Sequence, residues 1–149
     1  MARFQFRLAT LRRLREQHRD ELRGRLAEAY EAEQVLQRQR DGLQQEAESL
    51  RGMQQQMVAV ASPNVNQLLE AQRYGLVLQG RNVVLAEQLR QVAAEVERRR
   101  QAVVEADRQV RALDKLAERQ HAEFLREQQR IDHRLMDEIA GQRQGAIEP

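Results

Sequence analysis

The sequence predicts an all-α protein, a long antiparallel coiled coil of two helices, and three observations support this fold class. Apolar residues make up 41% of the chain and recur with a helical period, whereas aromatic residues make up only 3%. Charged residues make up 32%, and the abundant Ala, Leu, Glu, Gln and Arg all favour helices. The 149 residues include only two prolines, Pro63 and the terminal Pro149. High charge alone would fit disorder, but the periodic apolar residues argue against it.

The first helix is expected over about residues 6–61, because a seven-residue repeat runs through this segment. The repeat consists of Leu8, Arg15, Leu22, Ala29, Leu36, Leu43, Leu50 and Met57. Arg15 is its one charged member. A period of seven held over this length predicts a left-handed supercoil rather than globular helix packing. We expect the coiled-coil core to include Leu22, Leu36, Leu43 and Leu50.

A turn is expected at residues 62–66, where Ser62-Pro63-Asn64 is the clear turn signal in the middle of the chain. Asn64 or Asn66 is placed to cap the helix that follows. The second helix is expected over about residues 67–140, with a flexible tail at 141–149. Its core residues are expected to be Leu85, Val92, Val96, Val103 and Val110. The whole chain, residues 1–149, is expected to form one coiled-coil domain.

The two apolar repeats match when the chain folds back on itself. With the turn centred near residue 64, facing residues have numbers that sum to about 128. Leu50 then faces Leu78, and Leu43 faces Leu85. Because these apolar layers coincide, a monomeric hairpin is favoured over helices that pair with other chains.

The second helix is longer than the first, so its far end is expected to lack a partner within the chain. The apolar stripe nevertheless continues there through Phe124, Ile131, Leu135 and Ile139. An apolar stripe without a partner indicates an interaction surface.

Catalytic and metal-binding chemistry is not expected. The chain has no cysteine, so it has no disulfide, thiolate nucleophile or zinc-thiolate site. Glu118 and His121 have the Glu-x-x-His spacing of di-iron bundles, but the sequence has no second copy of this motif. There is no phosphate-binding glycine-rich loop either. We therefore expect a protein that is not an enzyme and needs no cofactor.

Membrane insertion is not expected, because the longest apolar run is only Met57 to Ala61, far short of the roughly 18 residues of a span. A cytoplasmic location is expected. Residues 1–25 contain eight arginines and three acids, so nucleic-acid binding is an alternative. There is no aromatic platform on which bases could stack, so a solvated basic face or a face for an acidic protein surface is favoured over nucleic-acid binding.

Three short blocks lie in order along the chain: Phe4 to Leu11, Val110 to Arg119 and Leu135 to Ala140. They contain Phe-x-Phe-x-Leu-x-x-Leu, Leu-Asp-Lys-Leu-Ala-Glu-Arg and Asp-Glu-Ile-Ala. Together they resemble the FliJ family of flagellar export proteins, which carries Phe-x-Phe-x-Leu-x-x-Leu, Leu-Glu-Lys-Leu-x-Glu-Arg and Asp-Glu-x-Ala at corresponding places. The resemblance covers nearly the full length.

The resemblance implies a non-catalytic stalk or adaptor of the flagellar type III export apparatus, at the cytoplasmic base of the flagellum. It implies that the open helical ends bind the hexameric ring of the export ATPase, through Phe4, Phe6, Arg12, Arg19, Phe124, Ile131 and Leu135. It also implies a contact with the cytoplasmic domain of the export gate, through Tyr74 and Leu78. Export chaperones are a further class of partner that the resemblance implies.

Two other functions remain open on the sequence alone. One is a generic structural coiled coil that associates with itself. The other is a basic helical protein that binds nucleic acid. Neither function requires the three blocks, so the stalk or adaptor is the preferred interpretation.

Overall fold

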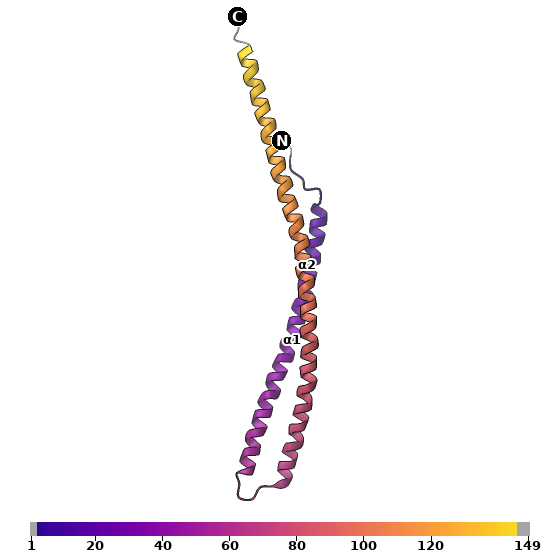
Figure 1. Ribbon diagram of the computed structural model, residues 1–149, viewed down its shortest axis with the longest axis vertical. Helices are drawn as coiled ribbons and strands as arrows, with labels where there is room; N and C mark the ends of the chain where they lie inside the picture. The colour runs from indigo at the N-terminus through magenta and orange to yellow at the C-terminus, as the bar shows by residue number, and fades with distance from the viewer. Residues whose placement is uncertain (1–2, 146–149) are drawn as a thin grey trace. The chain divides into compact units, whose positions relative to one another are not determined.

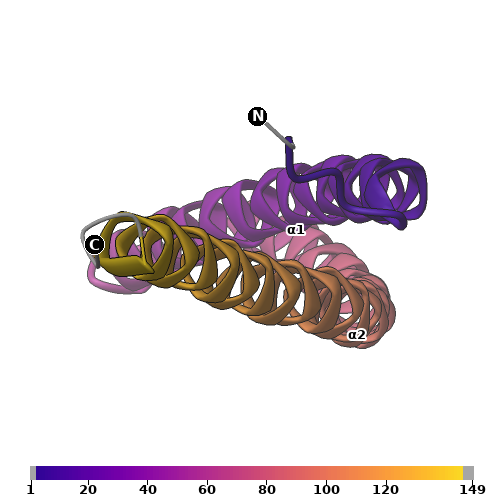
Figure 2. The same cartoon turned by 90° about the horizontal axis from the view of Figure 1, so that it is seen from above.

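A computed structural model describes residues 3–145, which form two long helices. Helix α1 spans Ala9–Val58 and helix α2 spans Val65–Gly145. The turn between them reverses the chain, so the two helices lie side by side and antiparallel (Figures 1 and 2). The predicted all-α hairpin is confirmed, and residues 3–145 contain no strand.

The ends of the helices have identifiable local causes. The side-chain oxygen of Asn64 accepts hydrogen bonds from the backbone N–H groups of Asn66 at 3.1 Å and Gln67 at 3.4 Å, so Asn64 is the cap of α2. At the start of α1, the N–H of Ala9 donates to the carbonyl of Phe6 at 3.1 Å. That turn separates α1 from the non-helical residues before it, so α1 begins later than predicted.

Helix α2 continues through Gly141 to Gly145, beyond the predicted end near residue 140. A glycine within a helix costs only about 1 kcal/mol relative to alanine, and no proline lies between Pro63 and Pro149 to stop the helix. The first part of the expected tail is therefore helical. Residues 146–149 of that tail lie outside the described residues.

The described chain divides into two compact units, each with a stretch of both helices. The terminal unit contains residues 3–20 and 104–145, and the turn unit contains residues 21–103. Each unit has its own buried seam. The terminal unit buries Ala106, Val110 and Ala117, and the turn unit buries Ala29, Ala71, Leu78, Leu85 and Val96.

The predicted core residues all lie on this interhelical seam. Leu85, Val96 and Val110 are buried, and the other six are half-buried: Leu22, Leu36, Leu43, Leu50, Val92 and Val103. Two helices can cover only one stripe of each other, so partial burial is expected even at core positions. Among residues 3–145, neither helix is long and apolar enough to cross a membrane.

Candidate protein-interaction surfaces

The terminal unit is held together by polar contacts between the helices. Arg12 forms an ion pair with Asp114 at 3.7 Å, and Arg19 forms one with Asp107 at the same distance. Between them, the guanidinium of Arg15 donates to the side-chain oxygen of Gln109 at 2.9 Å.

These contacts bear on the predicted roles of Arg12 and Arg19. Both side chains are directed to acids of α2, which partly neutralises the basic segment. Their side chains are 38% and 21% exposed, so a partner could still reach them, but a phosphate backbone would compete with Asp114 and Asp107. The structure thus gives the N-terminal arginines a role within the hairpin that the sequence alone did not indicate.

The residues before α1 pack on α2 through aromatic rings. The ring of Phe4 lies edge-on to His121, with centroids 5.0 Å apart, and 5.7 Å from the ring of Phe124. The guanidinium of Arg12 lies over the Phe6 ring at 5.7 Å. Such ring and cation contacts each contribute about 0.5 to 1.5 kcal/mol. Phe124 therefore has a partner within the chain, and the free stripe begins after it.

The far end of α2 carries an apolar surface that no described residue covers. Ile131, Leu135 and Ile139, which we call the terminal face, are 40%, 52% and 52% exposed. Their spacing of four residues places them on one side of the helix. Every described residue from 129 to 143 is exposed, and α2 continues past the start of α1 here (Figure 1). The predicted overhang is present, with Ile131 and Leu135 available and Phe124 half-buried.

A second uncovered apolar surface lies near the start of α2, within the turn unit. We call it the outer face, and it consists of Leu69, Leu76, Val77, Val83 and Val84, which are between 47% and 71% exposed. At 100° per residue, Leu69, Leu76 and Val83 lie opposite Leu78 and Leu85, which face α1. Val77 and Val84 lie on the flank of the helix, and Val84 also lines a groove with Leu43 of α1. A helix that is apolar on both sides is usually buried on both sides. The sequence analysis missed this face because it traced only the repeat that pairs with α1.

The two residues expected at a gate contact differ in their surroundings. Tyr74 is 41% exposed, and its hydroxyl donates to the carboxylate of Glu46 on α1 at 3.3 Å. Leu78 is only 4% exposed, because it belongs to the seam against α1. Tyr74 is thus accessible to a partner, whereas Leu78 supports the helix from beneath. The exposed large apolar residues at the start of α2 are Val65 and those of the outer face.

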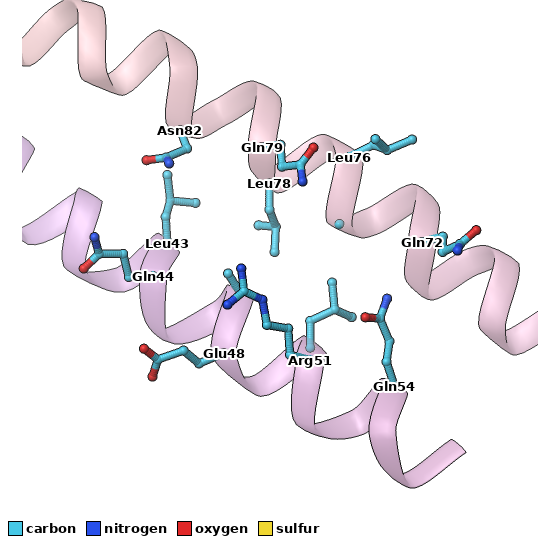
Figure 3. Close-up of a pocket in the computed structure, with 13 residues that line it drawn as sticks. Leu43, Gln44, Glu48, Arg51, Gln54, Gln72, Leu76, Leu78, Gln79 and Asn82 are labelled. Carbon is cyan, nitrogen blue, oxygen red and sulfur yellow. The ribbon is translucent and has the colours of Figure 1, made fainter. Parts of the chain in front are cut away.

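Shallow grooves flank the seam in the turn unit. One has a volume of about 790 Å³, and in it Leu43 and Leu78 point into the space between the helices (Figure 3). Leu50 lines the same groove, and a second groove of about 730 Å³ is lined by both Leu43 and Leu85. The predicted facing pairs therefore line common surfaces. Within residues 3–145, no group of three His, Cys, Asp or Glu side chains could hold a metal ion.

The part of α2 after the outer face is highly charged, and its charges pair along the helix. Arg90 donates to Glu87 at 2.7 Å, and Arg100 donates to Glu97 at 2.8 Å. The hydrogen bonds from Arg90, followed by one from Gln91, lower the pKa of Glu87 to about 2. Exposed pairs of this kind add little stability but keep the surface well hydrated. The exposed apolar side chains of the outer face therefore contrast with the charged side chains of the segment that follows it.

Comparison with known proteins identifies the family. Residues 4–146 match the family model described as Flagellar FliJ protein. The chain belongs to the FliJ family. This FliJ-family chain is therefore a flagellar protein associated with export, from a family of non-enzymatic components. No curated protein and no solved structure matches the chain.

The first two blocks of the family resemblance lie at the paired ends of the hairpin. The first block of the resemblance supplies Phe4 and Phe6, and the second block supplies Asp114. In the FliJ-family chain these blocks meet, because Arg12 contacts both Phe6 and Asp114. The third block, Leu135 to Ala140, lies on the uncovered end of α2.

Proposed function

We propose that this FliJ-family chain is a non-catalytic adaptor at the cytoplasmic base of the flagellum, which binds the export ATPase ring with its open helical ends and the export gate with the start of α2. The single observation that carries this proposal is the presence of two uncovered apolar surfaces, one in each unit. They are the terminal face and the outer face. A protein that joins two partners needs two such surfaces, whereas a simple spacer needs none.

The terminal face supports the ATPase contact. Exposed Ile131, Leu135 and Ile139 form a compact apolar stripe, and Arg130 and Arg134 flank it. Apolar anchors surrounded by charge are the usual composition of a protein interface. The family resemblance implies, as an expectation, that this end binds the ATPase. In this proposal Phe4 and Phe6 act indirectly, because Phe4 packs against Phe124 and fixes where the free stripe begins.

The outer face supports the gate contact. The resemblance implies a gate contact near the start of the second helix, and the outer face is an uncovered apolar surface in that segment. Tyr74 lies at its margin and is tied to Glu46. Leu78 supports the surface from the seam rather than forming part of it. Gate binding in this proposal therefore depends on residues such as Leu76 and Val83.

Two double variants test the two contacts separately. Ile131→Asp with Leu135→Asp should abolish retention of the cognate export ATPase in a pull-down and leave binding of the gate's cytoplasmic domain unchanged. Leu76→Asp with Val83→Asp should have the opposite effect. Each variant is the control for the other, because both exchange two exposed aliphatic residues for aspartates. Circular dichroism should show unchanged helicity. Loss of both partners from one variant, or of neither partner from both, would contradict the two-surface assignment.

A further inference from the structure

The outer face of α2 carries a coiled-coil repeat of its own. Six positions follow one another at alternating spacings of four and three residues: Leu69, Arg73, Leu76, Gly80, Val83 and Glu87. This is the spacing of the two seam positions in a heptad. All six are exposed. The five that carry side chains lie on the side of α2 turned away from Leu78 and Leu85, and Gly80 borders the groove that Leu43 and Leu85 line. Helix α2 thus has a second coiled-coil seam that no described residue covers.

This second seam is complementary to itself. When two copies of α2 are aligned antiparallel about a two-fold axis at Gly80, Leu76 lies opposite Val84 of the partner subunit. In the same alignment Val77 lies opposite Val83 of the partner subunit. A two-fold axis repeats every contact, so each of these two pairs occurs once on either side of the axis. Val77 and Val84 lie beside the repeat rather than in it, so apolar pairs flank Gly80 on both sides of the axis.

The same alignment also pairs opposite charges. Arg73 lies opposite Glu87 of the partner subunit, so one such pair closes each end of the apolar centre. Among residues 3–145, Arg73 forms no hydrogen bond or ion pair. Glu87 is exposed and ionised, and its carboxylate accepts hydrogen bonds from Arg90 at 2.7 Å and from Gln91 at 3.1 Å, so Arg73 of a second copy would join an existing charge pair. The exposed ends of this surface therefore carry charges that favour an antiparallel second copy and disfavour a parallel one.

Gly80 at the centre is suited to a close helix crossing. No atom of the described chain lies within 4 Å of the position that a Cβ would occupy at Gly80. Packing inside the hairpin therefore does not require glycine here, although glycine weakens the helix by about 1 kcal/mol. A missing Cβ at the crossing point lets two backbones approach. This observation agrees with the two-fold alignment but does not carry it alone.

We propose that the free protein forms a weak two-fold dimer in which the outer faces of two copies pack antiparallel about Gly80. The contact spans about five helical turns, so its Kd should be on the order of 10–100 μM. The chain is monomeric below that range, as the apolar layers of the hairpin predicted. The dimer covers the outer face, so a second copy and the proposed gate partner exclude each other. The dimer itself does not depend on the proposed function.

Sedimentation equilibrium of the full chain with charge-reversal variants tests the dimer. Arg73→Glu alone and Glu87→Arg alone should each weaken association by about tenfold or more, because both ends of the contact then oppose like charges. The double variant should restore the wild-type Kd. An equimolar mixture of the two single variants should also associate, because each contact then joins an acid to a base.

The matched control is Arg126→Glu, which makes the same charge change at an exposed position of the same helix far from the repeat and should leave the Kd unchanged. Circular dichroism of each variant checks that helicity is retained. A wild-type chain that stays monomeric up to about 500 μM would overturn the dimer, since this is well above the expected Kd. Failure of the double variant to restore association would also overturn it. So would a wild-type dimer that is split by Ile131→Asp with Leu135→Asp instead.

Discussion

Replacing Leu85 by alanine should destabilise the hairpin by about 2–3 kcal/mol. Leu85 is 5% exposed in the seam of the turn unit. The substitution removes three carbon atoms from a nearly water-free position, and at about 0.8 kcal/mol per buried carbon this gives about 2.4 kcal/mol. The additional cost of an empty cavity should be small, because Leu85 borders an open groove that water can enter.

The matched control is Leu135→Ala, which makes the same chemical change where the side chain is 52% exposed. Its cost should be below about 0.5 kcal/mol, because little area is buried and alanine has the higher helix propensity. Leu43→Ala, at a half-buried position, should fall between them at about 1–2 kcal/mol.

Urea unfolding followed by far-ultraviolet circular dichroism measures these differences. The midpoint should fall clearly for Leu85→Ala and hardly at all for Leu135→Ala, with similar slopes. Because the chain has two compact units, a second transition in the wild-type curve would require fitting the two units separately. Equal effects of the two substitutions would refute the assignment of Leu85 to the core and of Leu135 to an uncovered surface.

Three further predictions concern charge and backbone. Arg12→Glu should lower the melting temperature more at low salt than at high salt, because it opposes Asp114; the ion pair is exposed, so the cost should stay below about 1 kcal/mol. An NMR titration of Glu87 should have its midpoint near pH 2, and Arg90→Gln should move this midpoint back toward 4.5. Folding lowers this pKa, so the contribution of the Glu87–Arg90 pair to stability is present above pH 4.5. That contribution is lost as the pH falls through about 2. Gly75→Ala should raise stability by up to about 1 kcal/mol, because the new Cβ would make an ordinary contact at 3.5 Å with the neighbouring side chain. Thermal unfolding of that variant would disprove this if its midpoint fell.

The fold was predictable because the core positions of a coiled coil recur in the sequence with a fixed period. The heptad of α1 and the single turn signal at Pro63 were sufficient to place Leu43 and Leu85 on one surface. The register in the terminal unit is slightly shorter than predicted. Arg12 pairs with Asp114 and Arg19 with Asp107, and in both pairs the two residue numbers sum to 126 rather than about 128. The turn begins at the end of α1, before Pro63, so a centre at residue 64 was placed too late.

The exposed apolar surfaces were predictable only in part. The terminal overhang followed from the unequal helix lengths, so Ile131 and Leu135 were found from the sequence. The contact between Phe4 and Phe124 was not, because residues outside a helix carry no period that fixes where they pack. The outer face was missed for a different reason. Leu69, Leu76 and Val83 repeat every seven residues, as the core does, and the period alone does not say which seam faces α1.

The most direct test of the two-surface adaptor is whether one copy of the chain can hold the export ATPase and the gate's cytoplasmic domain at the same time. Size-exclusion chromatography with light scattering on the three purified proteins would measure this. The proposal predicts a ternary complex that contains all three, and its reduction to a gate complex by Ile131→Asp with Leu135→Asp. It also predicts reduction to an ATPase complex by Leu76→Asp with Val83→Asp. Two binary complexes that compete and never combine would contradict it.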